Sequence, residues 1–313
     1  MKRKLLDILI CPACLPDEVP LGIEEAEARG GEVIEGTMPC GRCGSAYPIR
    51  NGVARVVPGD RDRAGGAAGR YEGPDVLSAY LWSHYADLFN DPDASPAYTR
   101  WAGELSIGGG AGLDAGCAAG RFTFEMARKC DFAIGIDRSE VFIRTAREIL
   151  GAGRLVFRVL DEGRIRSERE IILPEAWRTQ NVEFIVADAH ALPFRSGAFT
   201  CVASLNLVDK VPGPLDHVLE TNRVARSRGA QLLISDPFSW SEEVSPPENW
   251  LGGMESGEFA GPAIENISRL LAGEGGKVSP PWSIARRGSV WWKIRNHSNH
   301  FELIRSLYIK AER

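Results

Sequence analysis

The chain has 313 residues, and its 42 acidic and 37 basic residues give a net charge of −5. This balance offers no overall electrostatic case for binding nucleic acid or an acidic membrane surface. The sequence contains no run of eighteen apolar residues and shows no apolar region of a signal peptide at its N-terminus, so we expect a cytoplasmic protein without membrane association. The length suits one large domain and one small one.

Residues 1–58 contain two Cys-x-x-Cys pairs, Cys11 with Cys14 and Cys40 with Cys43. The two-residue gap lets one turn present both sulfurs to a metal, and thiolates are ligands that Zn²⁺ prefers. A redox pair or disulfides are the alternative interpretations, but a segment this short needs a stabilising metal or cross-link. Because cysteine fills all four positions, the pattern predicts a small domain with a closed, structural zinc site.

The same segment resembles the small zinc-binding activator proteins of methyltransferases. The resemblance is carried by Leu5 to Cys14 and by Cys40 with Tyr47 to Val53. Those partners stabilise RNA- and protein-modifying enzymes by covering an apolar sheet edge, so here the module would be fused in cis. A nucleic-acid-binding finger is the alternative, but seven cations against eight acids make a poor phosphate-binding surface.

Residues 59–75 are rich in Gly, Ala, Arg and Asp, a composition that predicts a flexible linker. Residues 76–89 then have the apolar spacing of an amphipathic helix, which contains His84 and Tyr85. These two aromatic side chains could simply pack on a sheet. In methyltransferases, however, helices ahead of the first strand commonly cover the cofactor.

A short apolar stretch ending in Asp114 runs into a small-residue turn, Gly116 to Gly120, and a helical pattern follows. A phosphate-binding loop is disfavoured because no Gly-Lys-Ser/Thr closes the turn and an acid lies at the strand end. That acid suits a cationic ligand with hydroxyls and an amino-acid moiety, such as S-adenosylmethionine (SAM). Two further apolar strands end in Asp137 and Asp188, and the spacing to Asp137 is that of a ribose-binding carboxylate.

This combination resembles the class I SAM-dependent methyltransferases. The resemblance implies an α/β fold with a Rossmann-like seven-stranded sheet over residues 76–313. It also implies that the first acid and the turn hold the methionine end of SAM, the second acid the ribose, and the third the adenine. Taken singly, each acid could instead be a helix cap or a solvated strand end. One departure is that alanine replaces the usual middle glycine of the turn. The expected cofactor-binding residues are Asp114, Gly116, Cys117, Ala118, Gly120, Arg121, Asp137, Arg138, Asp188, Ala189 and Asn206.

Beyond the second strand, residues 139–150 predict a helix capped by Ser139, and residues 151–180 predict an inserted hairpin or excursion. A fourth strand leads into Asn206 and Asp209, which we expect near the transferred methyl group because ligands bind beyond the carboxyl ends of such strands. Asn206 could alternatively cap the next turn. After a fifth strand, the loop of residues 236–253 is dense in aromatics, acids and prolines and predicts a substrate wall or lid.

From about Leu77 onward the chain resembles, more narrowly, the mercaptohistidine N-methyltransferase domain of ovothiol-biosynthesis enzymes. The matching segments include His84-Tyr85, Gly116 to Arg121, Gly135 to Ser139, Asn206 to Lys210 and the loop Trp240 to Gly253. That family also has Gly-Cys-Ala in the turn. The chain departs at Asn299-His300, where the family usually has a basic pair, and in carrying a zinc module where those enzymes have sulfur-transfer domains.

The resemblance implies a SAM-dependent methyltransferase that N-methylates a small imidazole or amino-acid-derived metabolite. Two alternatives stay open: methylation of tRNA, rRNA or a translation protein, and a non-catalytic SAM-binding or scaffold protein. We assign an acceptor-orienting role to Asn206, ring stacking to the loop tryptophans, and carboxylate binding to Arg295. The candidate catalytic residues are Asn206, Asp209, His84 and Tyr85, and the candidate substrate-binding residues are Trp240, Glu242, Glu243, Asn249, Trp250 and Arg295.

Overall fold

The structure is a computed structural model that describes residues 1–59 and 73–313, so most of the predicted linker at 59–75 lies outside the described residues. The strands are β1 (Glu24–Arg29), β2 (Glu32–Pro39), β3 (Ala46–Arg50), β4 (Val53–Val56), β5 (Ala111–Ala115), β6 (Phe132–Asp137), β7 (Arg154–Glu162), β8 (Ile165–Ile172), β9 (Val182–Ala187), β10 (Cys201–Leu205), β11 (Gln231–Asp236), β12 (Ser283–His297) and β13 (His300–Glu312). The α-helices are α2 (Pro74–Tyr85), α3 (Ala97–Glu104), α4 (Arg121–Ala127), α5 (Glu140–Ala152), α6 (Pro214–Val224) and α7 (Ala263–Leu271).

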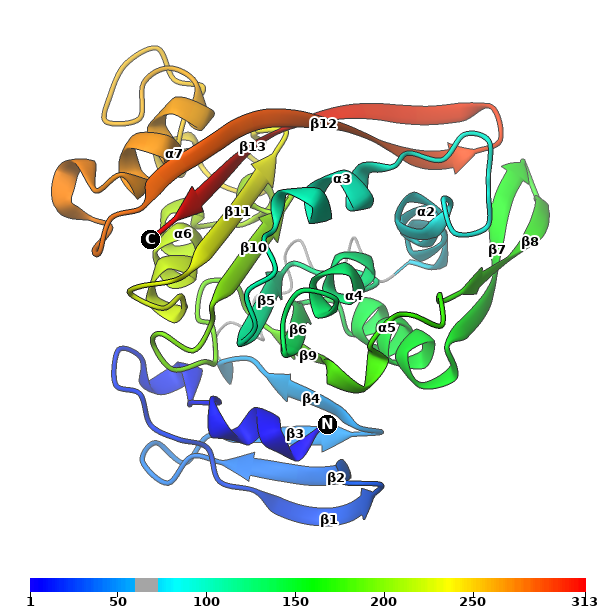
Figure 1. The fold of residues 1–313 in the computed structure, drawn as a ribbon, viewed down its shortest axis with the longest axis horizontal. Coiled ribbons are helices and arrows are strands. Elements are labelled where there is room, and N and C mark those ends of the chain that lie inside the picture. Colours follow the sequence, from blue (N-terminus) through cyan, green and yellow to red (C-terminus); the bar gives the residue numbers. More distant parts are fainter. Residues whose placement is uncertain (60–72) are drawn as a thin grey trace.

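A large mixed sheet forms the centre of the molecule, in the order β1-β2-β3-β4-β9-β6-β5-β10-β11-β13-β12 (Figure 1). From β9 to β11 the strands are parallel, and β13 and β12 add to this part in antiparallel fashion. These seven strands, with order reversing between β5 and β10, form the expected Rossmann-like sheet. The predicted fold class is therefore confirmed.

The N-terminal strands continue this sheet. Strands β1 to β4 form an antiparallel meander, and β4 then pairs in parallel with β9 through Arg55 opposite Val186 and Val56 opposite Ala187. The edge of β9 is thereby covered by the N-terminal segment, which lies at the bottom of Figure 1. An unpaired edge of this apolar strand would expose a row of backbone N–H and C=O groups.

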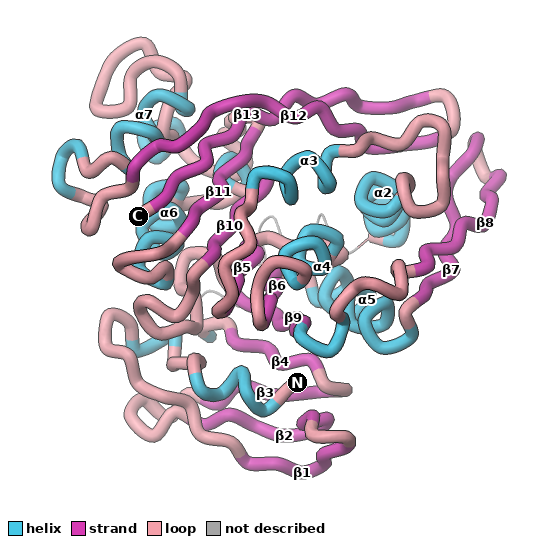
Figure 2. Tube along the Cα trace, in the orientation of Figure 1, coloured by secondary structure: helices cyan, strands magenta, loops and turns pink. Residues whose placement is uncertain are grey.

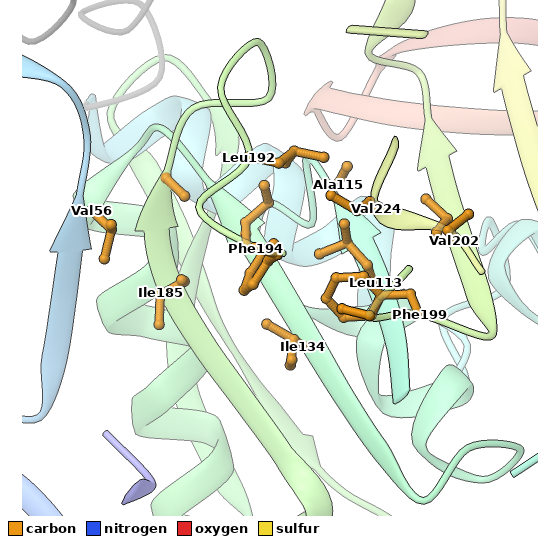
Figure 3. Close-up of a cluster of buried hydrophobic side chains, with 14 of the residues drawn as sticks. Val56, Leu113, Ala115, Ile134, Ile185, Leu192, Phe194, Phe199, Val202 and Val224 are labelled. Atoms are coloured by element: carbon orange, nitrogen blue, oxygen red, sulfur yellow. The ribbon is translucent and has the colours of Figure 1, made fainter. Parts of the chain in front are cut away.

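Alternate residues of the parallel strands pack on opposite faces of the sheet, because successive strand side chains point to opposite sides. On one face, Leu113, Ile134 and Ile185 pack with Phe194 and Phe199, as Figure 3 shows. Helices α6 and α7 and the N-terminal segment also pack on this face. On the other face, Ala133, Phe184, Val186 and Leu233 pack with side chains from α2, α3, α4 and α5.

The helices predicted around residues 76–89 and 139–150 are present as α2 and α5. Ser139 caps α5 as expected, because its Oγ accepts the backbone N–H of Phe142 at 3.2 Å. The inserted segment forms the hairpin β7–β8, which is a separate two-stranded sheet rather than an extension of the central one.

The C-terminal hairpin β12–β13 is long and extends beyond the central sheet, over α2 and α3 (Figures 1 and 2). Ser83 and Ser95 donate hydrogen bonds from their Oγ atoms to the carbonyls of Lys293 (2.6 Å) and Trp291 (2.7 Å). These bonds fasten α2 and the segment before α3 to the outer edge of the sheet. Within the described residues, no helix is both long and apolar enough to cross a membrane.

Candidate active site

A cavity of about 1020 Å³ lies beyond the carboxyl ends of the parallel strands. Asp114, Asp137 and Leu205 line it at the ends of β5, β6 and β10. Its roof is formed by α2, α3 and the β12–β13 hairpin through Tyr80, His84, Tyr98, Trp292, Ile294 and Ile304. This is the crevice in which doubly wound sheets bind ligands, and its volume suits a cofactor together with a small second molecule.

The small-residue turn between β5 and α4 forms the floor of one half of the cavity. Gly116 (φ 79°), Ala118 (φ 43°) and Gly120 (φ 86°) all have left-handed backbone conformations. A Cβ on Gly120 would lie 2.6 Å from the Phe184 ring, so that position has no room for a side chain. Ala118 lines the cavity, and its strained backbone N–H donates to Asp137 Oδ2 at 3.0 Å. This bond fixes the turn against the second acid and helps to offset the strain at Ala118.

The third acid, Asp188, belongs to a hydrogen-bonded chain along the same wall. Arg138 Nη1 donates to Asp188 Oδ2 at 2.7 Å. His190 Nε2 accepts the backbone N–H of Gly213 at 3.1 Å, so its proton is on Nδ1, which donates to Asp188 Oδ1 at 2.8 Å. These hydrogen bonds connect Asp188, on the side of the cavity expected to hold adenine, with the loop at Gly213.

The two best buried acids on this wall have pKa values shifted in opposite directions. Burial raises the pKa of Asp114 to about 7, although Thr123 Oγ1 donates to its Oδ2 at 2.7 Å. Burial also acts to raise the pKa of Asp188, but hydrogen bonds from His190 and the charge of Arg138 hold it well below its usual range. A cationic group placed against Asp114 would favour its ionised form, which fits the amino group of an amino-acid ligand.

Asn206, Lys210, Pro212, Ser239 and Asn249 line the other half of the cavity, opposite the roof residue Trp292. Asn206 directly follows β10, has a left-handed backbone (φ 55°) and donates its backbone N–H to the Ser235 carbonyl at 2.6 Å. Since asparagine tolerates this conformation better than most residues, its backbone aims the side chain into the cavity at low cost.

His84 lies on the roof with its ring 4.5 Å from that of Tyr98. The side chain is buried, and burial together with the charge of Arg121 lowers its pKa to about 3. The imidazole is therefore neutral at physiological pH. Among the described residues, its Nδ1 has no hydrogen-bond partner.

The four N-terminal cysteines come together as a cluster distant in sequence from the cavity residues. Their sulfurs all lie within 4.8 Å of one another, with Cys11 and Cys43 3.6 Å apart and Cys14 and Cys40 3.7 Å apart. Tetrahedral zinc with Zn–S bonds of about 2.3 Å requires sulfurs about 3.8 Å apart, so the cluster fits this ion. Tyr47 Oη and Ser45 Oγ each lie 3.2 Å from a cluster sulfur and can orient the ligands.

Comparison with known protein families finds a match in each of two parts of the chain. Residues 113–233 match the family described as methyltransferase domain, and residues 2–52 match that described as Trm112p-like protein. The first match spans the turn, the three acids and Asn206. The chain is a SAM-dependent methyltransferase.

No curated protein matches the methyltransferase. Solved structures show a similar arrangement at low sequence identity. Magnesium protoporphyrin IX methyltransferase from Synechocystis PCC 6803 with bound SAM is 17% identical and covers 69% of this chain and 76% of its own, with a TM-score of 0.41. The complex of the Trm112 methyltransferase activator with a methyltransferase from Haloferax volcanii is 12% identical and covers 75% of this chain and 96% of its own, with a TM-score of 0.43.

Most of the predicted cofactor residues line the methyltransferase cavity. Those on the wall are Asp114, Gly116, Cys117, Ala118, Asp137, Arg138, Asp188, Ala189 and Asn206. Gly120 and Arg121 lie behind the wall. The Arg121 guanidinium is buried, donating to Glu125 at 2.6 Å and to Asp87 at 2.8 Å, and it lies over the Trp177 ring. It therefore links α4 to the segment after α2.

The other predicted catalytic residues have different surroundings. His84 lines the cavity, whereas Tyr85 is buried beside it and donates its hydroxyl to the Ala119 carbonyl at 2.7 Å. Asp209 is buried behind Lys210, whose Nζ lies 3.1 Å from Asp209 Oδ2. The same carboxylate oxygen accepts the backbone N–H of Ser239 at 2.7 Å. Tyr85 and Asp209 thus shape the wall without forming its surface.

The predicted substrate-binding loop is only partly on the cavity. Asn249 lines it, while Trp240 and Trp250 stack on each other with ring centroids 5.9 Å apart. Glu242 and Glu243 are exposed and are not among the lining residues. Arg295 binds the inserted hairpin, donating to the Leu160 carbonyl at 2.7 Å and to Asp161 Oδ1 at 2.8 Å.

Several lining residues were given no role by the sequence. Tyr98 comes from α3, Trp292 from β12 and Lys210 from the turn after β10. Lys210 lies only four residues after Asn206, so its place on the cavity could have been predicted from the sequence. For Tyr98 and Trp292 no local motif exists, because only the folding of the C-terminal hairpin over α3 brings them to the cavity.

Proposed function

We propose that this enzyme transfers the methyl group of SAM to a nitrogen of a small imidazole-containing or amino-acid-derived metabolite of the mercaptohistidine type. The observation that carries the proposal is the covered acceptor half of the cavity. Tyr98, His84 and Trp292 line it from α3, α2 and β12, and Asn206 and Lys210 line it from the segment after β10. A flat ring of a few atoms suits this space better than a polymer does.

When bound, SAM supplies an activated methyl group on a sulfonium. The protein therefore has to position the acceptor nitrogen in line and keep it unprotonated. Aromatic side chains on the roof can stack on a flat ring, and Asn206 lies directly after the strand whose tip the methyl group should reach. Because burial keeps His84 neutral, the roof adds no positive charge that would repel an imidazolium product.

The test is methyl transfer from radiolabelled SAM, measured in parallel with histidine-derived thiols, related imidazoles and bulk RNA. The proposal expects turnover with one or more imidazoles and none with RNA. Turnover with RNA and with none of the small molecules would contradict it. Calorimetry with S-adenosylhomocysteine on the same preparation establishes that the cofactor site is intact.

A second candidate is methylation of tRNA, rRNA or a translation protein. The Trm112p-like match over residues 2–52 favours it, since that segment is fused here to the catalytic sheet. Binding of RNA that weakens steeply as salt rises would support this candidate.

A further inference from the structure

Asn206 is connected to the roof of the cavity by a short chain of buried hydrogen bonds. Trp292 Nε1 is 3.0 Å from Ser306 Oγ, and Ser306 Oγ is bonded in turn to Asn206 Oδ1. Ser306 is fully buried and lies on β13 opposite Val290, two residues from Trp292 along β12. The chain thus crosses from β12 through β13 to the turn after β10.

The chemistry of these groups fixes the direction of each bond. An indole N–H can only donate, so Ser306 Oγ accepts from Trp292. Among the described residues, the Asn206 amide is the other partner of this buried hydroxyl, so Ser306 must donate its own proton to it. The Asn206 atom that faces Ser306 is therefore the carbonyl oxygen, because the opposite amide orientation would leave the buried Ser306 proton without an acceptor.

This orientation leaves the Asn206 amide N–H groups for the cavity. Lys210, four residues later, also lines the cavity and can only donate. One of its protons points to Asp209 at 3.1 Å, which leaves two for a ligand and holds the ammonium in place. Of the cations on the described cavity wall, Arg138 is engaged with Asp188, on the cofactor side. The acceptor half thus presents two donor groups that are four residues apart in the chain, one of them charged.

We infer that Asn206 and Lys210 form a subsite for a carboxylate of the methyl acceptor, and that Trp292 and Ser306 are positioning residues that set the Asn206 amide. This inference rests on the proposed function for the choice of acceptor. It assigns to Lys210 the role that the sequence suggested for Arg295, whose guanidinium is occupied by the inserted hairpin. The enzyme should therefore select amino acids over their decarboxylated amines.

The experiment measures binding to the full-length enzyme saturated with S-adenosylhomocysteine, using three matched acid and amine pairs: histidine and histamine, tryptophan and tryptamine, and cysteine and cysteamine. Wild-type enzyme should bind at least one acid about tenfold more tightly than its amine, and Lys210→Met should remove that difference, since a hydrogen bond to a charged group contributes about ten- to a hundredfold. Ser306→Ala and Trp292→Phe should each weaken the acid about three- to tenfold and leave the amine unchanged. Trp291→Phe, on the exposed neighbour of Trp292, and Lys277→Met are the matched controls.

Equal binding of acid and amine in every pair, or no binding of any acid, would overturn the inference. It would also be overturned if the variants weakened S-adenosylhomocysteine instead, because the carboxylate would then belong to the cofactor. A preference for the acid confined to a pair without an imidazole would support the subsite and would identify the acceptor as an amino-acid derivative without an imidazole. Thermal unfolding of each variant shows whether the fold is retained.

Discussion

The two halves of the cavity are built in different ways. The cofactor half uses short segments in which the functional residue lies within two or three residues of a strand end, as Asp114, Asp137 and Asp188 do. The acceptor half combines α2, α3, the turn after β10 and the C-terminal hairpin, and a bond such as that from Ser83 to Lys293 joins residues 210 positions apart. A cofactor site can thus be inherited as a set of local turns, whereas the acceptor site depends on how distant segments pack.

Loss of the zinc cluster should have the largest effect, and it should reach the cofactor half first. Four thiolates hold structural zinc with an apparent free energy on the order of 10 kcal/mol, and β4 pairs with β9 immediately before Asp188. Cys40→Ser should therefore lower the melting temperature markedly and weaken SAM binding about tenfold or more. Metal analysis, thermal unfolding and calorimetry measure this. A metal-free variant that melts and binds SAM like the wild type would contradict it.

Asp137→Ala should show that SAM affinity depends on the cofactor half of the cavity and not on the acceptor half. It removes the acceptor of the backbone N–H groups of Ala118 and Ser139 along with the expected ribose contact, so we expect SAM affinity to fall about a hundredfold. Asn249→Ala, on the acceptor side, is the comparison and should leave SAM affinity within about threefold. Calorimetric titration with SAM decides the matter, and similar losses in both variants would show that the halves are not independent.

Asn206→Gly should have the converse effect. Glycine keeps the left-handed backbone and removes the amide, so turnover should fall about a hundredfold while SAM still binds. Asn206→Ala adds about 1 kcal/mol of backbone strain, and comparing the two variants separates the side chain from the turn. Initial rates and SAM titrations are the measurements. Unchanged turnover in the glycine variant would remove Asn206 from the acceptor site.

The smallest effect is a pH dependence confined to the cofactor half. Burial raises the pKa of Asp114 to about 7, and the ionised form is the one that can hold a cationic amino group. SAM affinity should therefore rise about tenfold from pH 6 to pH 8 and level off above that. In the enzyme without SAM, the contribution of Asp114 to the stability of the fold is greatest below about pH 4 and is lost as the pH rises towards 7. Asp114→Asn should abolish this dependence of SAM affinity, and its persistence would assign it elsewhere.

Much of the fold could be predicted because its signals are local. Apolar strands ending in acids, and the cysteine pairs at knuckle spacing, each determine structure within a few residues. Ala118 is instructive, since the sequence treats it as a departure while the structure retains the left-handed turn through a bond to Asp137.

The acceptor residues could be predicted less well, for a physical reason. Arg295 has the right chemistry for a carboxylate, but its partner Asp161 is 134 positions away, in a hairpin whose packing no local pattern encodes. Trp240 and Trp250 likewise stack on each other, so neither ring lines the cavity. Competition between a ligand and distant side chains for the same group is decided only by the tertiary structure.

The pairing of β4 with β9 has a practical consequence for anyone who wishes to produce the catalytic part alone. A fragment beginning at residue 76 would uncover the edge of β9 where β4 pairs with Val186 and Ala187 in the intact chain. An unpaired strand edge of this kind can pair with strands of other chains and cause aggregation. The N-terminal domain should therefore keep the catalytic domain soluble. Expression of residues 76–313 alone should give inclusion bodies rather than active enzyme.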